Sequence, residues 1–563
     1  KSIAFLSTRK EFDEDQEIYL IPRDGGEAKQ VSHSESSIQL FQWSPDGKWI
    51  AYVATDPKSR KETSAEKAGR DWKIADQNYK HRRLWALEFD TGETHKIVEV
   101  DLSVWSFAWS PDSKKLVLQA TETPKTDDSY MFKKIYTISV KGGTPKLLCP
   151  TKGKLGNMTW SPDGKSIAFL SAVDVHDPTN GSVFLVSAEG GQAKNLTPNF
   201  QGTATHVAWL DKSTLAFSAI EGTKTSLNLL SLKNNNIQKV VSDGPIFYSF
   251  SLAKNGKTFA CAANTTSHPN EILFGSTKGK KLKWLTESNP VLKKIPLAEQ
   301  ETIRWKSTDG LEIQGVLWKP LNYQSDRKYP LIVQVHGGPE SAYLDGWQTS
   351  YSRWAQLMAA RGYFFLMPNY RGSTGRGVAF SKGDQNDHGG KEFEDVLAGI
   401  DYLTEKGLID PERVGIGGGS YGGYLSAWAA THHSERFKAA VVFAGVTNWI
   451  SKSGTSDIPY ENALVHWTSW WWENPDLVWN RSPMANIKFA KTPTLIAHGE
   501  KDKRVPIGQA WELYRGLKHM GVPTEFVIYP REPHGLRERA HKLDYLNRVI
   551  DWFDQYVKGE RTN

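Results

Sequence analysis

Cysteine is scarce in this chain of 563 residues, which has only two, Cys149 and Cys261, far apart in sequence. Two distant cysteines exclude a disulfide-stabilised scaffold and a metal site built from thiolates. The chain also lacks an apolar run long enough to span a bilayer, and no secretion signal is visible at Lys1. We therefore expect a globular protein with no metal, no cofactor and no membrane span.

Charge of one sign is not concentrated anywhere. The formal net charge of +7 is small for this length, and no basic cluster is interleaved with aromatic residues. This pattern gives no support for nucleic-acid binding. The length exceeds what one hydrophobic core usually organises, so the chain has more than one domain.

The first half of the sequence is repetitive. The segments WSPDGKWIAYVA, WSPDSKKLVLQA and WSPDGKSIAFLS begin at Trp43, Trp109 and Trp160, and looser copies begin at Trp209 and Phe250. Each unit consists of an aromatic residue, a turn and a strand in which apolar and polar residues alternate. Further strands, such as LWALEFD and KIYTISV, follow each unit. Short strands repeating about every 40–50 residues predict a β-propeller. A β-sandwich would leave the repeated W-S-P-D-G unexplained.

The chain begins with KSIAFLS, which matches the repeat from its middle onward. We therefore expect seven blades over residues 1–290, the first of them incomplete, and a segment upstream of Lys1. A lost leader would favour a periplasmic or secreted location over the cytoplasm, and the sequence leaves the compartment open.

The pattern changes after WLTESNP, which ends at Pro290. The segment from Glu301 to Pro320 predicts an antiparallel hairpin, and apolar strands then alternate with helical segments to the end of the chain. This alternation predicts a mostly parallel sheet covered by helices on both faces, over residues 291–563.

A nucleophile elbow is predicted at Ser420, in the stretch GIGGGSYGGY. The serine fits G-x-S-x-G, in which small residues let a strand turn sharply into a helix and hold the hydroxyl above the sheet. Glycine-rich turns of this kind also bind phosphate, but no lysine follows as in a P-loop. We interpret Ser420 as a nucleophile.

An acid and a histidine should follow a serine of this kind in the order Ser, Asp, His. Asp502 follows the apolar strand TPTLIAHG, and His534 follows the strand TEFVIYP. Both lie just beyond a strand end, where open α/β sheets place their sites. His534 would accept the proton of Ser420, and Asp502 would orient the imidazole. His498 is interpreted as a core residue.

An oxyanion-binding loop is predicted upstream of the elbow. The apolar strand KYPLIVQV runs into His336-Gly337-Gly338-Pro339, which resembles the HGGG-type loop of esterases. A backbone N–H of this loop and that of Tyr421 would hold the developing negative charge. His336 itself is interpreted as structural.

These motifs together resemble the prolyl oligopeptidase family of serine peptidases. The matching pieces are the propeller repeats, HGGP, PNYRGSTGRG, GGSYGGY, GEKDKRVP and YPREPHG, and they cover nearly the whole chain. The resemblance is closest to the acylaminoacyl-peptidase and bacterial dipeptidyl-peptidase branch. It implies an α/β-hydrolase domain, an oxyanion hole from the backbone of Gly338 and Tyr421, and a site between the two domains that only short peptides reach. It also implies a possible homo-oligomer, dimeric or larger.

The loops before Asp502 are expected to form the substrate pocket, because the segment is rich in aromatic residues. We single out Trp449, Trp467 and Trp471 as pocket walls, and Arg504 as a donor to a substrate carbonyl or carboxylate. A charged insertion between Thr55 and Arg83 lacks the paired glutamates of the dipeptidyl peptidase IV relatives, so it is given no role beyond a solvated face.

The sequence favours an exopeptidase that cleaves short peptides, and it leaves two alternatives open. A carboxylesterase acting on small acyl esters would use the same serine chemistry. A non-catalytic scaffold would use the propeller to bind partners. Dipeptidyl, acylaminoacyl and internal cleavage are not distinguished by the sequence.

Overall fold

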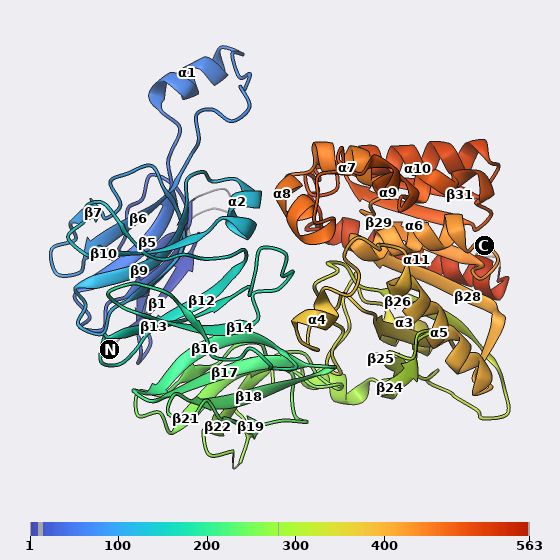
Figure 1. Ribbon diagram of the computed structural model, residues 1–563, viewed down its shortest axis with the longest axis horizontal. Coiled ribbons are helices and arrows are strands. Elements are labelled where there is room, and N and C mark those ends of the chain that lie inside the picture. Colours follow the sequence, from blue (N-terminus) through green and yellow to red (C-terminus); the bar gives the residue numbers. More distant parts are fainter. Residues whose placement is uncertain (1, 9–14, 280, 561–563) are drawn as a thin grey trace.

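Six antiparallel sheets make up the first half of the chain in the computed structural model, which describes residues 2–8, 15–279 and 281–560 (Figure 1). The first sheet has three strands and each of the others has four, and the strands within each sheet pair in sequence order. Their bounds, sheet by sheet, are β1 (Ser2–Ser7), β2 (Glu17–Pro22) and β3 (Lys29–Gln30); β4 (Ile38–Trp43), β5 (Trp49–Thr55), β6 (Arg82–Glu88) and β7 (Thr94–Lys96); β8 (Ser103–Trp109), β9 (Lys115–Thr121), β10 (Lys134–Ser139) and β11 (Lys146–Cys149); β12 (Leu155–Trp160), β13 (Ser166–Ser171), β14 (Ser182–Ser187) and β15 (Lys194–Asn195); β16 (Thr203–Asp211), β17 (Thr214–Glu221), β18 (Lys224–Ser231) and β19 (Ile237–Val241); and β20 (Ser251–Leu252), β21 (Thr258–Ala263), β22 (Glu271–Ser276) and β23 (Lys283–Trp284).

The predicted propeller is present, but the prediction of seven blades is wrong. The described residues form six blades, the first with three strands. A blade needs roughly 40–50 residues, so a segment that ends near residue 290 accommodates about six of them. Lys1, where the expected incomplete blade would begin, lies outside the described residues.

The repeated W-S-P-D-G segments form the same structure in successive blades. In the turns at Ser44, Ser110 and Ser161 the serine hydroxyl donates to the aspartate two residues later, at 2.6, 2.7 and 2.6 Å. The tryptophans join neighbouring blades, because Nε1 of Trp160 donates to the Ala108 carbonyl at 3.1 Å and that of Trp109 donates to the Gln42 carbonyl at 3.2 Å. The sequence repeat is therefore a contact between blades as well as a turn.

The second half of the chain contains one eight-stranded sheet with the order β24-β25-β27-β26-β28-β29-β30-β31. As predicted, β24 and β25 form an antiparallel hairpin, and the strands from β27 to β31 are parallel. The bounds are β24 (Gln300–Lys306), β25 (Glu312–Trp318), β26 (Tyr329–Val335), β27 (Phe364–Asn369), β28 (Ile409–Gly419), β29 (Ala439–Phe443), β30 (Thr494–Gly499) and β31 (Thr524–Tyr529).

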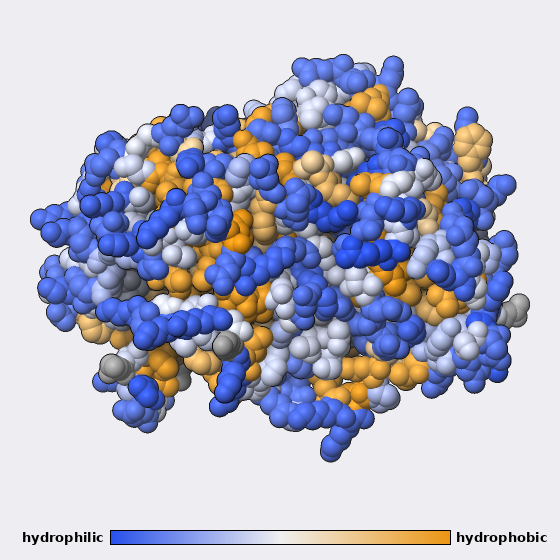
Figure 2. All heavy atoms as spheres, turned by 60° about the horizontal axis from the view of Figure 1, so that its bottom comes forward, coloured by the Kyte–Doolittle hydropathy of each residue, from blue (hydrophilic) through white to orange (hydrophobic). Residues whose placement is uncertain are grey.

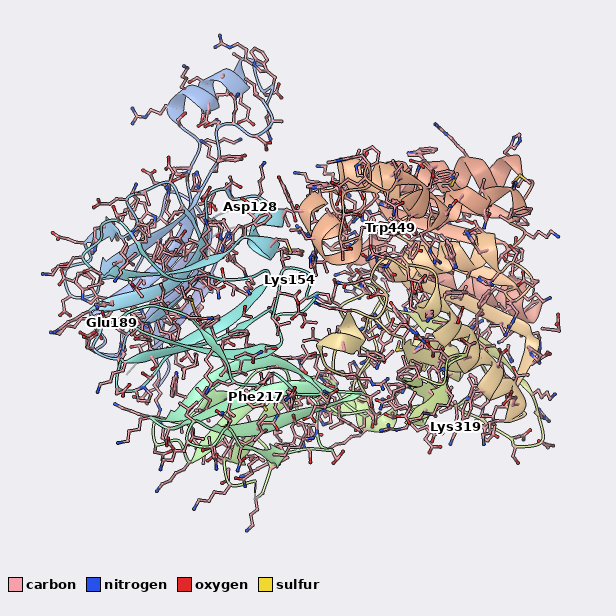
Figure 3. The ribbon with its side chains drawn as sticks, viewed as in Figure 1. Asp128, Lys154, Glu189, Phe217, Lys319 and Trp449 are labelled. Atoms are coloured by element: carbon pink, nitrogen blue, oxygen red, sulfur yellow. The ribbon has the colours of Figure 1, made fainter. Side chains whose placement is uncertain are left out.

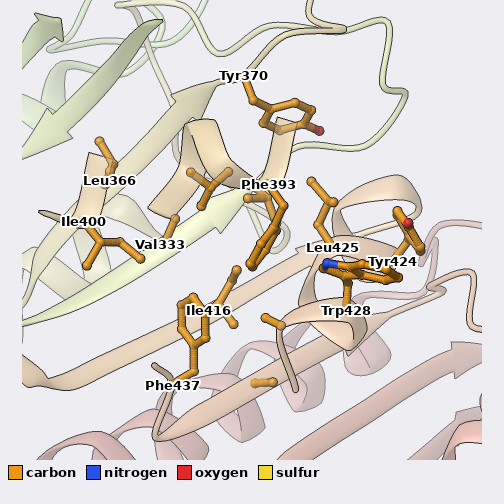
Figure 4. Close-up of a cluster of buried hydrophobic side chains, with 14 of the residues drawn as sticks. Val333, Leu366, Tyr370, Phe393, Ile400, Ile416, Tyr424, Leu425, Trp428 and Phe437 are labelled. Atoms are coloured by element: carbon orange, nitrogen blue, oxygen red, sulfur yellow. The ribbon is translucent and has the colours of Figure 1, made fainter. Parts of the chain in front are cut away.

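Helices pack on this sheet and bury large apolar side chains against it. In Figure 4, Phe393 of α5 and Leu425 and Trp428 of α6 lie over Val333 and Ile416 of the sheet. The helices are α1 (Arg60–Lys67) and α2 (Thr126–Met131) in the propeller half, then α3 (Ala355–Ala360), α4 (Val378–Ser381), α5 (Lys391–Glu405), α6 (Tyr421–His432), α7 (Trp449–Thr455), α8 (Pro459–Glu461), α9 (Pro475–Asn480), α10 (Gly508–His519) and α11 (Arg539–Phe553); shorter 3₁₀ or π turns are η1 (Pro290–Lys294), η2 (Asn462–His466), η3 (Pro483–Phe489) and η4 (Asp554–Lys558).

The two halves meet along a boundary where α2 packs against α8 (Figure 1). The carboxylate of Asp127 in α2 accepts hydrogen bonds from the backbone N–H groups of Tyr460 and Glu461, at 2.5 and 3.0 Å. The insertion that carries α1 projects from the propeller, and α1 has no buried residue.

Hydrophilic side chains predominate on the face drawn in Figure 2, with apolar ones scattered among them. Among the described residues, no helix combines the length and apolarity needed to cross a bilayer. Cys149 and Cys261 are free and buried, and burial raises the pKa of each thiol to about 11.

Candidate active site

Ser420 lies at a sharp turn between β28 and α6, as the elbow motif predicts. Its backbone has φ 59° and ψ −120°, a strained conformation for a residue with a side chain. The turn is tightly packed, because a Cβ added to Gly422 would lie 2.1 Å from the Val335 carbonyl oxygen. Only glycine fits there, and this packing holds the serine hydroxyl at the start of the helix.

His534 and Asp502 come together with Ser420 from separate loops. Nε2 of His534 lies 2.9 Å from Oγ of Ser420, and its Nδ1 lies 2.7 Å from Oδ2 of Asp502. Asp502 follows β30 and His534 follows β31, which are neighbours in the sheet. Parallel strands place their carboxyl ends at the same edge, so residues distant in sequence meet there.

The carboxylate of Asp502 is buried and surrounded by donors. Burial alone would raise its pKa, but contacts with His498 and His534 hold the pKa of Asp502 below its ordinary value. Backbone N–H groups of Arg504 and Val505 also donate to Oδ1, at 2.9 and 3.0 Å. Asp502 is therefore anionic and fixed opposite Nδ1 of His534.

His498 and His336 are both buried, in line with the structural roles expected for them. Nε2 of His498 lies 2.7 Å from the Val505 carbonyl and 3.3 Å from Oδ2 of Asp502. The ring of His336 stacks on Tyr370, and burial lowers the pKa of His336 to about 4. His498 thus also contacts the acid, which the sequence did not suggest.

The His336-Gly337-Gly338-Pro339 loop passes directly over the elbow. A Cβ on Gly337 would lie 2.8 Å from the Gly419 carbonyl oxygen and 3.1 Å from Cβ of Ser420. The ring of Tyr421 is anchored below, where its hydroxyl lies 2.9 Å from Oε1 of Glu392 and 2.6 Å from Nδ1 of His388. These contacts fix the backbone on both sides of the serine.

Comparison with known proteins finds a family match in the second half of the chain. The family model described as the prolyl oligopeptidase family matches residues 349–560, which include Ser420, Asp502 and His534. The second half of the chain therefore contains a peptidase domain similar to those of the prolyl oligopeptidase family. The family resemblance inferred from the sequence motifs is thereby confirmed.

Relatives of this peptidase extend along nearly the whole chain. An uncharacterized peptidase of Bacillus subtilis, YuxL, is 29% identical over 99% of this chain and 89% of its own length. A dipeptidyl-peptidase 5 of Porphyromonas gingivalis is 27% identical over 96% of this chain and 90% of its own length. The solved acylaminoacyl peptidase of Pyrococcus horikoshii has a TM-score of 0.81 at 22% identity, over 100% of this chain and 88% of its own, which shows a shared fold.

The peptidase has a cavity of about 530 Å³ at the domain boundary, and Ser420 and His534 are in its wall. Its lining combines an apolar part, formed by Val446, Trp449, Ile458 and Val505, with charged groups from both domains. A concave site with a few converging polar groups is the usual form of a substrate pocket.

Of the four predicted substrate-binding residues, two are in the lining of the cavity and two are not. Trp449 and Arg504 line the cavity. Trp467 is not in the lining; it is fully buried and packs edge-on against Trp449, with ring centroids 5.5 Å apart. Trp471 packs against the hydrolase core and against Trp472. The guanidinium of Arg504 donates to Asp457 at 2.7 Å and to the Tyr130 hydroxyl at 3.0 Å.

Several cavity groups were missed by the sequence reasoning, namely Tyr130, Lys154, Glu340 and Glu461. Glu340 directly follows the predicted oxyanion loop, so its position was a usable signal. Tyr130 and Lys154 come from propeller connections between strands, and no local pattern indicates that these connections face the hydrolase domain.

Proposed function

We propose that this protein is a serine exopeptidase that cleaves short peptides through an acyl-enzyme formed on Ser420. The observation that carries the proposal is the continuous set of contacts from Asp502 through His534 to Ser420, at 2.7 and 2.9 Å, in the wall of a cavity between two domains. In such a set the serine is activated by a neutral imidazole that the acid keeps in the correct orientation.

The reaction follows from this geometry. Nε2 of His534 accepts the Ser420 proton as Oγ attacks the scissile carbonyl, and backbone N–H groups of Gly338 and Tyr421 stabilise the oxyanion. The imidazolium then protonates the leaving amine, and the C–N bond breaks. A water molecule attacks the acyl-enzyme while it gives a proton to His534. That proton passes to Oγ of Ser420 as the bond between Oγ and the acyl carbon breaks and the acid product leaves.

The residue before the cleaved bond is proposed to be apolar. Trp449, Val446 and Ile458 form the apolar part of the cavity wall. Burial of an apolar side chain against them contributes about 25 cal/mol per Å² of area removed from water. Trp467 supports Trp449 from behind. Arg504, which is paired with Asp457 and lines the cavity, is proposed to donate a hydrogen bond to a substrate oxygen.

Selection of short substrates follows from the placement of the cavity between residues 1–290 and 291–563, which we propose as the two functional domains. The names of the relatives, acylaminoacyl peptidase and dipeptidyl-peptidase 5, favour removal of residues from a chain end. A homo-oligomer is an expectation that rests on the family resemblance alone, and light scattering in solution tests it.

The test combines covalent labelling with a substrate panel. A fluorophosphonate should label wild-type protein at Ser420, and the enzyme should hydrolyse short peptide anilides with an apolar residue before the anilide. Ester hydrolysis without any anilide or peptide hydrolysis would instead identify a carboxylesterase. Folded protein that neither reacts with the probe nor hydrolyses any substrate would identify a scaffold.

A further inference from the structure

A lysine lies in the wall of the catalytic cavity, beside its apolar part. Lys452 follows Trp449 by three residues in α7, and its Nζ lies 5.3 Å from the centre of the indole ring. Both residues line the cavity together with Ser420. Trp449 lies in the hydrolase domain, across the domain boundary from Lys154 of the propeller (Figure 3). The amino group of Lys452 is therefore next to the wall on which the side chain before the cleaved bond is proposed to pack.

Lys452 uses only part of its capacity to donate hydrogen bonds. It is 3% exposed, and its Nζ donates to Oδ1 of Asn462. A protonated lysine has three N–H donors, so two of them remain for other acceptors. Nδ2 of Asn462 is itself buried without a hydrogen bond among the described residues. Two adjacent groups with unused donors thus lie at the apolar wall, and converging donors of this kind bind a carboxylate.

Two carboxylates of the hydrolase domain favour the charged form of Lys452, but both are paired with other cations. Oε1 of Glu461 lies 2.5 Å from Nζ of Lys154, and Oδ1 of Asp457 lies 2.7 Å from Nε of Arg504. The charge of Arg504 acts against a second cation nearby. None of the ion pairs among the described residues includes Lys452, so neither carboxylate compensates its charge directly.

A third carboxylate that acts on Lys452 comes from the propeller. Asp127 accepts hydrogen bonds from the backbone N–H groups of Tyr460 and Glu461, and burial raises the pKa of Asp127 to about 6. Burial also lowers the pKa of Lys452 to about 7, so its amino group is partly neutral near neutral pH. A buried amine without a counter-ion destabilises a fold, and such groups are common at functional sites.

Glu340, the remaining carboxylate in the lining, faces other basic groups. Its Oε1 lies 3.3 Å from Nε2 of His466 and 3.7 Å from Nζ of Lys154. The acidic groups of the cavity wall thus have partners within the protein, whereas Lys452 and Asn462 keep unused donors. A ligand that completes the site must bring a negatively charged acceptor to the apolar wall.

We propose that Lys452 and Asn462 form the end of the pocket for the residue before the cleaved bond and bind a side-chain carboxylate there. The inference rests on the proposed function and deepens it, because it specifies how that side chain ends. Its methylene groups pack on Trp449, Val446 and Ile458, and its carboxylate pairs with the ammonium of Lys452. The neutral amine still accepts an apolar side chain, whereas the charged form prefers glutamate.

The test compares two dipeptide anilides that differ only in the residue before the anilide, which is glutamate in one and methionine in the other. The measured quantity is the ratio of kcat/KM for the glutamate substrate to that for the methionine substrate. Wild type should prefer glutamate at about pH 6, and the ratio should fall toward about pH 8 as Lys452 loses its proton. The catalytic groups act on both substrates alike, so their own pH dependence cancels in the ratio.

Two variants test the residues of the pocket. Lys452→Met should lower the ratio about tenfold or more at about pH 6, because the buried charge of the glutamate substrate then has no partner. Asn462→Asp places a carboxylate of the protein beside Lys452, which then competes with the substrate, so the ratio should fall in this variant as well. Lys438→Met, at an exposed lysine paired with Glu412, is the matched control and should leave the ratio unchanged.

The outcomes separate this pocket from the serine chemistry. Wild-type enzyme that is labelled by a fluorophosphonate but gives the same ratio as Lys452→Met overturns the pocket and leaves the proposed function standing. A wild-type ratio that stays constant or rises with pH does the same. Protein that is not labelled and cleaves neither substrate overturns both. Should Lys452→Met fail to fold, Asn462→Asp decides, because an unchanged ratio in that variant contradicts the proposal.

Discussion

In the propeller, three successive blades carry the same Ser-Pro-Asp turn with the same serine-to-aspartate hydrogen bond. In the hydrolase domain, the elbow at Ser420 occurs once, and it depends on the loop after β26 and on two further loops that bring Asp502 and His534. The comparison predicts that a defect in one blade lowers the stability of the protein but leaves its catalytic activity unchanged. A defect at the elbow should remove the chemistry.

The two regions also differ in what they bring to the cavity. The hydrolase domain supplies Ser420 and His534, whereas the propeller supplies Tyr130 and Lys154 from connections between its strands. Each of these propeller side chains contacts a charged partner in the hydrolase domain, Arg504 or Glu461. The propeller therefore forms part of the cavity wall and contacts the hydrolase domain there through a few polar groups.

The largest expected effect is at the serine itself. Ser420→Ala should lower kcat/KM on an apolar dipeptide anilide by about 10⁴-fold or more, because the acyl-enzyme cannot form. Its melting temperature should stay close to that of the wild type. Ser426→Ala is the matched control, a buried serine of the same helix whose hydroxyl only donates to the Gly422 carbonyl at 2.7 Å. Substantial residual turnover in Ser420→Ala would falsify the assignment of the nucleophile.

The packing of the elbow gives the next effect. Gly422→Ala places a Cβ 2.1 Å from the Val335 carbonyl oxygen and should destabilise the fold. We expect a loss of about 3 kcal/mol or more in the free energy of unfolding, measured by urea denaturation, together with at least tenfold lower activity. At Gly454 of α7 a new Cβ meets no atom within 4 Å, so Gly454→Ala serves as control. Equal behaviour of the two variants would contradict the close packing.

A buried lysine at the domain boundary makes stability depend on pH. Burial lowers the folded-state pKa of Lys452 from 10.5 to about 7, so the folded protein binds fewer protons than the unfolded chain between these values. Stability therefore rises with pH across this window, and the cost of the buried charge is fully present below it. Lys452→Met should melt at a higher temperature than wild type near neutral pH, and this advantage should shrink toward about pH 10.

Thermal melts of both proteins across this window measure the effect. Lys438→Met, at a lysine whose side chain is 44% exposed, is the control and should show no comparable trend. If the difference in melting temperature between Lys452→Met and wild type stayed constant with pH, the variant would act through packing and not through the charge.

The smallest effect is expected in a blade. Trp160→Phe removes the hydrogen bond from Nε1 to the Ala108 carbonyl, worth about 1 kcal/mol, and some buried area. The melting temperature should fall by a few degrees, while the rate of fluorophosphonate labelling at Ser420 should not change. Trp72→Phe, at a tryptophan that is 73% exposed, should alter neither the melting temperature nor the rate of labelling. Slower labelling in Trp160→Phe would mean that a blade and the elbow are coupled.

Local patterns were sufficient for most of the fold. The repeats from Trp43 to Trp209 predicted a propeller because each turn forms its hydrogen bonds within a few residues. The alternation after residue 300 predicted the parallel sheet, since its strands are buried on both faces. The number of blades was predicted wrongly, because six sheets rather than seven form in the described residues. That number depends on how much chain each blade uses, and the repeat motif does not contain this information.

The sequence alone determined the elbow at Ser420, the two strand ends that carry Asp502 and His534, and the loop that contains Gly338. Each of these depends on glycine positions or on strand ends, which local residue patterns encode. Only the tertiary structure decided that Lys154 lies between Glu340 and Glu461, and that Trp467 is buried behind Trp449. Such contacts join segments that are far apart in the chain, and their energy depends on burial, which no local pattern specifies.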